Sequence, residues 1–240
     1  MPAAPAVELA PGVYRIPTAP ADTINSFAFR DEDGQVTLVD CGLKRAPRRI
    51  VAGLAAMGTD PSEVTRIVMT HAHGDHAGGL AALRARTGAE VAAHERDAPY
   101  LRQGRPPARD PHVRGGRLFT RLPGGGFDPT EVTQEFTDGE VIKAAGGLRV
   151  VHTPGHTPGH VSLLHEPTGV LITGDAIFNV RGVRWPPSMM CTDFTLTRQT
   201  ADRLADLTYD VAAFTHGPEV RHAARETVRS FLRAAGQGPE

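Results

Sequence analysis

The sequence has little of what secreted or membrane proteins require. It contains two cysteines, Cys41 and Cys191, far apart in the chain. A disulfide framework is therefore not expected, and a cytoplasmic location is predicted. No apolar run approaches the roughly 20 residues that span a bilayer. The first residues, Met-Pro-Ala-Ala-Pro-Ala, also lack the positive and apolar regions of a secretory signal, so we expect no membrane partner.

An excess of charge of either sign is also missing. Lysine and arginine number 26 and aspartate and glutamate 27, which leaves a formal net charge of −1. Such a chain has no overall field to attract nucleic acid or anionic lipid, so we expect a small-molecule partner and no nucleic acid. The 240 residues, 40% hydrophobic and 22% charged, are typical of a single globular domain over 1–240. The oligomeric state is left open.

Short apolar strands alternate with amphipathic helices in both halves of the chain. This pattern favours an α/β (α+β) fold of two sheets packed face to face with helices outside. Strands are expected at Val13–Ile16, Ile24–Phe29, Val36–Val39, Arg66–Met69, Glu90–Ala93, Leu148–Val151, Val161–Leu164, Val170–Thr173 and Val211–Phe214. Helices are expected at Pro47–Met57, Ala77–Thr87, Thr195–Leu207 and Glu219–Leu232.

Histidine is abundant, with 11 residues, and its placement carries the chemistry. Four candidate metal ligands lie within the run His71-Ala72-His73-Gly74-Asp75-His76, directly after an expected strand. A loop at a strand end can turn several side chains toward one point, and imidazole with carboxylate suits zinc, iron or manganese. The plain alternative is a chance polar loop.

Further candidate ligands follow later strands. His152, His156 and His160 follow one strand, Asp175 follows another, and His216 follows a third. Each lies beside or close to a glycine, where a strand gives way to a loop. We therefore expect these strand ends to converge at one edge of the sheets.

Taken together, these motifs resemble the metallo-β-lactamase superfamily. They occur in the family's order and cover the chain from about Val7 to Arg233. The motifs that carry the resemblance are Val39-Asp40-Cys41-Gly42, Thr70-His71-x-His73-x-Asp75-His76-x-Gly78-Gly79, Thr153-Pro154-Gly155-His156-Thr157, Thr173-Gly174-Asp175 and Thr215-His216-Gly217. The resemblance implies a four-layer αββα sandwich with a dinuclear metal site, most simply two zinc ions per chain, with iron or manganese as alternatives.

The resemblance also assigns roles to individual residues. A first metal would be held by His71, His73 and His156. A second would be held by Asp75, His76 and His216. Asp175 would bridge the two, and Asp40 would orient a ligand histidine. His152 and His160 are expected to support the ligand loop, Cys41 to be a small buried residue, and His94, His112, His165 and His222 to be surface or structural residues.

The implied reaction is hydrolysis of an ester, thioester, lactone or lactam by a hydroxide shared between the two metals. Asp75 would orient that hydroxide or assist protonation. The pair Asp75-His76 with His156-x-x-x-His160 most resembles glyoxalase II-like enzymes. The added C-terminal helical region of glyoxalase II does not match the 24 residues after His216, and the lactone-cleaving branch uses the same ligands.

Two other functions remain open from the sequence. A persulfide dioxygenase of the same fold would bind a single non-haem iron through His71, His156 and Asp175. A metal-binding protein without catalysis is the third interpretation, against which the intact ligand set argues.

Two segments are candidates for the walls of a substrate pocket. Residues 101–126 are rich in Pro, Gly and Arg. They would form either a lid that favours an anionic substrate or a solvated loop. Residues 178–194 follow Asp175 directly and would start at the metal edge. Substrate contacts are predicted there from Trp185, Arg181, Arg184 and Met189, with a loop packed on the core as the alternative.

Overall fold

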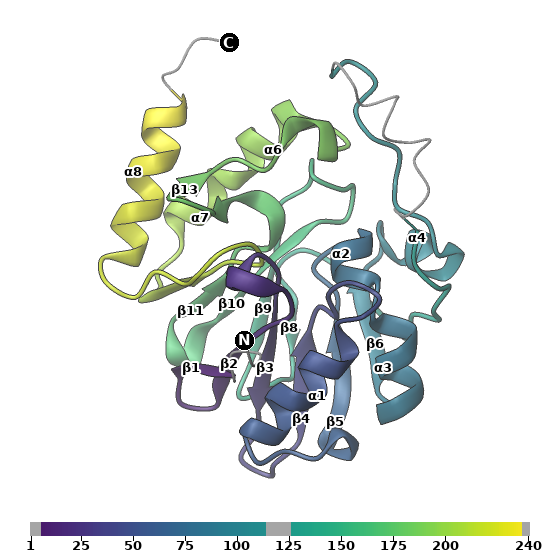
Figure 1. Ribbon diagram of the computed structural model, residues 1–240. Coiled ribbons are helices and arrows are strands. Elements are labelled where there is room, and N and C mark those ends of the chain that lie inside the picture. Colours follow the sequence, from purple (N-terminus) through teal and green to yellow (C-terminus); the bar gives the residue numbers. More distant parts are fainter. Residues whose placement is uncertain (1–5, 114–125, 237–240) are drawn as a thin grey trace.

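Two β-sheets lie face to face between layers of helices in the computed structural model, which describes residues 6–113 and 126–236 (Figure 1). The first sheet contains β1 (Val7–Ala10), β2 (Val13–Pro17), β3 (Asn25–Arg30), β4 (Val36–Val39), β5 (Val64–Val68), β6 (Glu90–His94) and β7 (Gln134–Phe136). The second contains β8 (Val141–Ile142), β9 (Leu148–His152), β10 (Val161–His165), β11 (Val170–Ile172) and β14 (Val211–Ala213). A small hairpin joins β12 (Phe178–Asn179) to β13 (Val183–Arg184).

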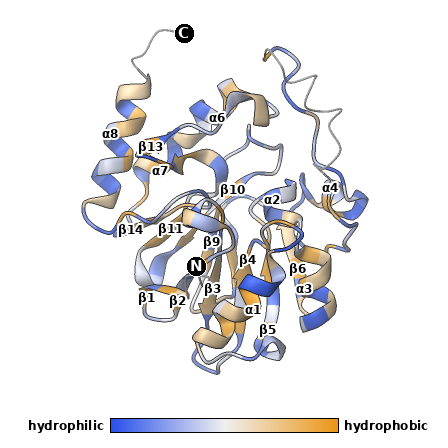
Figure 2. Ribbon diagram, viewed as in Figure 1, coloured by the Kyte–Doolittle hydropathy of each residue, from blue (hydrophilic) through white to orange (hydrophobic). Residues whose placement is uncertain are grey.

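Helices cover the outer faces of both sheets. The first sheet carries α1 (Pro47–Ala56), α2 (Gly74–Ala77), α3 (Leu80–Thr87) and α4 (Ala98–Gln103), and the second carries α6 (Phe194–Ala201), α7 (Arg203–Asp206) and α8 (Ala224–Gly236). The strands are largely apolar, whereas α1 and α8 mix apolar and polar residues (Figure 2). The predicted four-layer αββα sandwich is therefore confirmed.

The core between the sheets follows from strand alternation. Phe27 and Phe29 of β3 point into the inter-sheet core, whereas Ala28 between them packs with the helices on the outer face. Val161 and Leu163 of β10 point into the same inter-sheet core. Residues two apart share a face of a strand, so both sheets bury one apolar face against each other and the other face against helices.

Strand direction brings the loops that bear the candidate ligands to one edge. In the first sheet β4, β5 and β6 are mutually parallel. In the second, β11 is parallel to β14, and β9 and β11 each pair antiparallel with β10. The carboxyl ends of β4, β5 and β6 therefore share an edge, as do those of β9, β11 and β14. The side-chain contacts described below join the two edges.

Three predicted helices differ from the observed ones. The helix predicted at Ala77–Thr87 begins only at Leu80, as α3, and Ala77 is the last residue of α2. Gly78 and Gly79 lie between the two helices, and Gly79 packs so closely on Cys41 that a Cβ there would lie 2.4 Å from the Cys41 carbonyl oxygen. The helix predicted at Thr195–Leu207 is two helices, α6 and α7, that meet at Asp202.

The closing helix begins later than predicted. It starts at Ala224 rather than Glu219, because Glu219 pairs with Arg15 at 2.8 Å and Val220 forms a β-bridge with Ala212. The sequence analysis also missed β1, β7, β8, β12, β13 and α4. These elements are short, and their apolar positions are too few to show a period.

Among the described residues, none of the helices combines the length and the apolar character needed to cross a membrane.

Candidate metal centre

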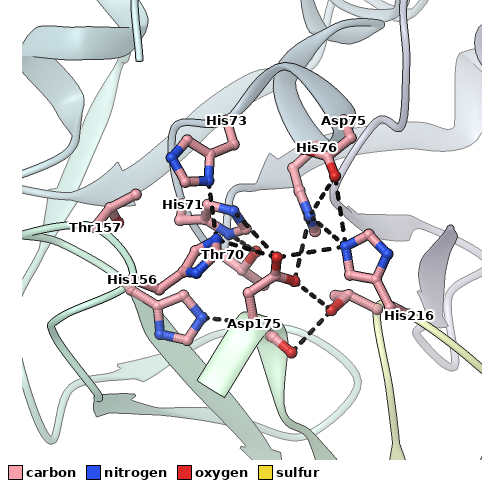
Figure 3. Close-up of polar contacts among 12 residues, drawn as sticks. Thr70, His71, His73, Asp75, His76, His156, Thr157, Asp175 and His216 are labelled. Carbon is pink, nitrogen blue, oxygen red and sulfur yellow. Dashed lines mark hydrogen bonds and ion pairs between the residues drawn. The ribbon is translucent and has the colours of Figure 1, made fainter. Parts of the chain in front are cut away.

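The predicted ligands come together at the shared edge of the two sheets (Figure 3). The run that follows β5 supplies four of them, with its last three residues in or beside the single-turn α2. Asp175 follows β11, and His216 follows β14. The potential ligand atoms form three groups, each within 4.8 Å: His71, His73 and His156; His71, His76 and Asp175; and Asp75, His76 and His216.

Ring nitrogens face one another across the centre. His73 Nδ1 lies 2.9 Å from His156 Nε2, and His76 Nε2 lies 3.3 Å from His216 Nε2. Two neutral imidazoles that turn lone pairs toward each other repel unless a proton or a cation lies between them. These contacts therefore mark two places where a cation would be favourable.

The Asp175 carboxylate lies between the two places. Its oxygens are 3.1 Å from His156 Nε2, 3.3 Å from His76 Nε2 and 3.4 Å from His216 Nε2. The backbone NH of Asp175 donates to His160 Nε2 at 2.7 Å, and Thr215 Oγ1 donates to Asp175 Oδ1 at 2.7 Å. Its remaining oxygen, Oδ2, is buried and has no hydrogen-bond partner among the described residues.

Orphaned polar atoms test whether these residues fit a metal ion. His71 Nε2, like Asp175 Oδ2, is buried without a hydrogen-bond partner in the described part of the chain, and the two atoms lie 3.8 Å apart. An unpaired buried polar atom costs about 1–3 kcal/mol, and a cation would satisfy both atoms at once. The donor set of imidazole and carboxylate is also the one that zinc and iron accept.

The outward nitrogens of four rings are held in place. His71 Nδ1 contacts Thr70 Oγ1 at 3.0 Å, and His216 Nδ1 contacts the Thr23 carbonyl at 2.7 Å. His156 Nδ1 contacts Cys191 Sγ at 3.5 Å. Such partners fix the tautomer and the ring plane, so that the other nitrogen presents its lone pair to a cation.

Asp40 holds the fourth ring and joins two ligand segments. Its Oδ2 lies 2.8 Å from His76 Nδ1 and accepts a hydrogen bond from Thr70 Oγ1 at 2.7 Å, while Oδ1 accepts from the Thr70 backbone NH at 2.9 Å. Asp40 is fully buried, with φ of +60°. This is the contact that the resemblance implied for Asp40.

Asp97 was missed by the sequence analysis. Its buried carboxylate accepts from the backbone NH of Ala72 at 2.8 Å, from Thr157 Oγ1 at 2.6 Å and from the backbone NH of Gly159 at 2.7 Å. Asp97 thereby ties the loop of the histidine run to the loop of His156. The one sequence signal is its place in the polar run His94-Glu95-Arg96-Asp97 after an expected strand, which does not show which segments the carboxylate joins.

The electrostatics of the centre suit cation binding. Burial and the neighbouring imidazoles hold the pKa of His71 and of His73 well below the usual value for histidine. Burial opposes ionisation of Asp175, but His216 and His76 beside it outweigh burial and keep its pKa well below the ordinary value. Burial also opposes a proton on His156, which Asp175 outweighs, raising the pKa of His156 to about 9. A cation that binds here would displace that proton.

A small hollow opens beside the first histidine group. It holds about 180 Å³, and its lining consists of Leu43, His73, Gly74, Asp75, Pro106, Arg109 and Met190. Arg109 is half-buried there and acts electrostatically on His73. The predicted lid over 101–126 thus contributes Pro106 and Arg109, whereas its residues 114–125 lie outside the described residues.

The four predicted substrate contacts are placed elsewhere. Trp185 packs on Phe231 of α8 with ring centroids 4.9 Å apart, under the guanidinium of Arg198. Arg181 and Arg184 are exposed, and Met189 is half-buried. None of the four lines the hollow, where Met190 lies instead, and their contact with a substrate stays a prediction.

The two stacked sheets and the histidine and aspartate groups at their shared edge define the class of metallohydrolases built on an αββα sandwich. The chain belongs to the metallo-beta-lactamase superfamily, whose family model matches residues 19–216. An uncharacterized protein of Bacillus subtilis, YobT, is 33% identical over 222 residues, covering 87% of this chain and 89% of that protein.

Other similar proteins support the same family. A hydroxyacylglutathione hydrolase of Rhodopseudomonas palustris is 30% identical over 128 residues, which cover 53% of this chain and 39% of that protein. The crystal structure of a metallo-beta-lactamase family protein from Thermus thermophilus superposes with a TM-score of 0.72 at 28% identity, covering 95% of this chain and 81% of that one.

Proposed function

We propose that this protein is a metal-dependent hydrolase that holds two divalent ions, most simply zinc. His71, His73 and His156 would hold one ion, and Asp75, His76 and His216 the other, with Asp175 between them. The observation that carries the proposal is the pair of ligand groups on either side of Asp175, together with its buried oxygen Oδ2, which faces three of these rings without a hydrogen bond among the described residues. A single-ion centre held by His71, His156 and Asp175 would not use Asp75, His76 and His216 as ligands.

Two divalent ions supply Lewis acidity that activates water and polarises a carbonyl group. The chain's own residues supply position and proton control. Asp75 is the ligand closest to solvent, with its side chain 18% exposed, and it lines the hollow. It is therefore placed to orient a water molecule and to pass a proton to the leaving group.

We propose that the substrate is a small molecule with an ester, thioester or lactone bond. The carbonyl chemistry that two divalent ions support favours these bonds, and the small, partly apolar hollow beside His73 favours a small substrate. The partial match to a hydroxyacylglutathione hydrolase supports a thioester. A lactam is the fourth bond type that the resemblance implies, and it stays an alternative substrate.

The test is a panel of thioesters, lactones and β-lactams assayed with metal-loaded protein. Hydrolysis of at least one class, abolished by a chelator and restored by zinc, is the expected result. Oxygen consumption with a persulfide substrate and one bound iron would instead identify the mononuclear dioxygenase. Metal-loaded protein that neither hydrolyses a member of the panel nor consumes oxygen with a persulfide would favour a metal-binding protein without catalysis.

Arg109 is expected to select substrates that carry a negative charge. Replacing Arg109 with glutamine should raise KM for an anionic substrate by about tenfold, which corresponds to one charge-assisted hydrogen bond. KM for a neutral analogue of the same ester should stay within about twofold. The readout is the ratio of the two KM values.

Arg105 provides the matched control, because it lies on the same segment, is exposed and does not line the hollow. Arg105→Gln should leave both KM values unchanged. If Arg109→Gln shifts the two KM values equally, Arg109 has no part in charge selection.

A further inference from the structure

A second cavity lies at the other end of β14 from the metal centre. His216 follows the carboxyl end of β14, whereas Thr208, Tyr209 and Asp210 precede its amino end. The cavity holds about 460 Å³ and lies between this segment and the start of α8, the helix at the edge of the molecule in Figure 1. Its lining consists of Thr208, Tyr209, Asp210, Arg221, Ala223, Ala224, Arg225, Glu226 and Arg229.

Three polar groups in this lining have no partner. Tyr209 is only 3% exposed, and its hydroxyl is buried without a hydrogen bond among the described residues. Nε of Arg225 and Nε of Arg229 are buried and unpaired in the same way. Buried polar groups are almost always hydrogen-bonded in native proteins. Three such atoms gather around this one cavity, where a ligand would satisfy them once their side chains turn toward it.

Among the described residues, the two arginines also lack ion-pair partners. Arg225 and Arg229 are four residues apart on α8, so their like charges lie on the same face and repel. Within the described residues, neither has a carboxylate oxygen within ion-pair distance. Arg221, by contrast, is engaged with Glu219 Oε1 at 3.0 Å and with the carbonyls of Glu8 and Leu9.

The two carboxylates of the lining form no ion pair with these arginines in the described part of the chain. Glu226 Oε1 accepts a hydrogen bond from Ser230 Oγ at 3.1 Å. The Asp210 carboxylate lies against Gly169, where an added Cβ would be 2.9 Å from Asp210 Oδ2. Burial raises the pKa of Tyr209, with Arg225 and Arg229 opposing, so its hydroxyl stays protonated as a donor.

The helix itself adds to this environment. The 13-residue α8 begins at Ala224, and the lining includes Ala223, Ala224 and Glu226 at its start. Unpaired backbone NH groups and the positive end of the helix dipole favour an anion at this position. Arginine guanidinium groups match the geometry of phosphate oxygens.

We propose that this cavity binds a phosphate group, free or carried on a small organic molecule, between Arg225, Arg229 and the first turn of α8, with Tyr209 as a further donor. The site is separate from the metal centre and does not depend on the proposed hydrolysis. Binding would neutralise the two guanidinium groups and stabilise α8 against the second sheet.

The experiment measures phosphate binding to metal-loaded protein. Inorganic phosphate and glycerol phosphate are titrated into wild type, into the double variant Arg225→Gln/Arg229→Gln and into Arg233→Gln, with calorimetry and Tm as readouts. Arg233 is the matched control, because it is exposed on α8 and does not line the cavity. Equal metal content in the three proteins shows that the metal centre is intact, so phosphate bound at the metals appears equally in all of them.

The expected result is saturable binding and a rise in Tm for wild type and Arg233→Gln, with affinity at least about tenfold weaker in the double variant. Tyr209→Phe keeps the ring and removes the unpartnered hydroxyl, and it should weaken binding while the protein stays folded. A preference for glycerol phosphate would indicate an organic phosphate as the ligand. Equal affinities in wild type and the double variant, or no saturable binding to wild type beyond the metal centre, would overturn the proposal.

Discussion

Asp175→Ala is expected to abolish hydrolysis and to release metal from the protein. Asp175 is fully buried, and its carboxylate lies within 3.8 Å of a ring nitrogen of His71, His76, His156 and His216. Removing it takes away the one negative charge shared by both ligand groups. We expect a loss of activity greater than the roughly 10–100-fold typical of residues that only support a metal ligand.

The measurement combines metal content per chain with kcat for the best substrate. Asp206→Ala serves as the control, because Asp206 is a carboxylate on α7, outside the three ligand groups of the centre. Circular dichroism checks that Asp175→Ala remains folded. An Asp175→Ala protein that is folded, keeps its full metal content and retains activity would refute the proposed site.

Asp40→Asn is expected to weaken metal binding by about 10–100-fold without unfolding the protein. Asp40 is expected to act through His76, whose Nδ1 lies 2.8 Å from Asp40 Oδ2, and through Thr70. Asparagine has nearly the same shape and tolerates the left-handed conformation observed at φ of +60°. It lacks the charge that makes His76 a stronger ligand, which sets the expected magnitude.

Competition with a chelator of known affinity gives the metal dissociation constants. Asp33→Asn is the matched control, since Asp33 lies in an exposed turn, where its carboxylate accepts hydrogen bonds from Gln35. The metal affinity of Asp33→Asn should equal that of wild type. If Asp40→Asn also binds metal as tightly as wild type, Asp40 has a purely structural role.

The resemblance of the motifs to the metallo-β-lactamase superfamily indicated the family and assigned the candidate ligands, and the strands that precede the motifs predicted the edge at which they meet. A strand can be recognised from a few apolar residues, and its direction in a layered fold dictates the edge at which it ends. The residues that join the loops to one another could not be predicted from the sequence. Asp97 reaches residues in two other loops, at Ala72 and at Thr157 and Gly159, and such contacts exist only once the chain is folded.

The pocket was the least predictable part for the same reason. Trp185 was assigned to a substrate wall because it follows Asp175 closely in sequence, yet its ring packs on Phe231. Arg109 was only one of six arginines between Leu101 and Arg121, and sequence could not distinguish it from its neighbours. Similarly, His94 was expected to be a surface or structural residue, and the structure buries it, stacked on His152 with ring centroids 4.1 Å apart.

The predicted helix boundaries were wrong where tertiary contacts override the local helix preference of the sequence. Glycine at 78 and 79 allows the backbone to approach Cys41 and Lys44 so closely that a Cβ at either position would meet a backbone atom. The start of α8 is delayed because Glu219 and Val220 have partners outside the helix. Sequence periodicity contains neither kind of information.

Metal content of the purified protein, measured by elemental analysis after loading with zinc or with iron, tests the central claim most directly. The account predicts about two zinc ions per chain, with the second lost when His216 is replaced by alanine and both weakened when Asp175 is replaced. One iron per chain that survives His216→Ala, or no bound metal after loading, would contradict it.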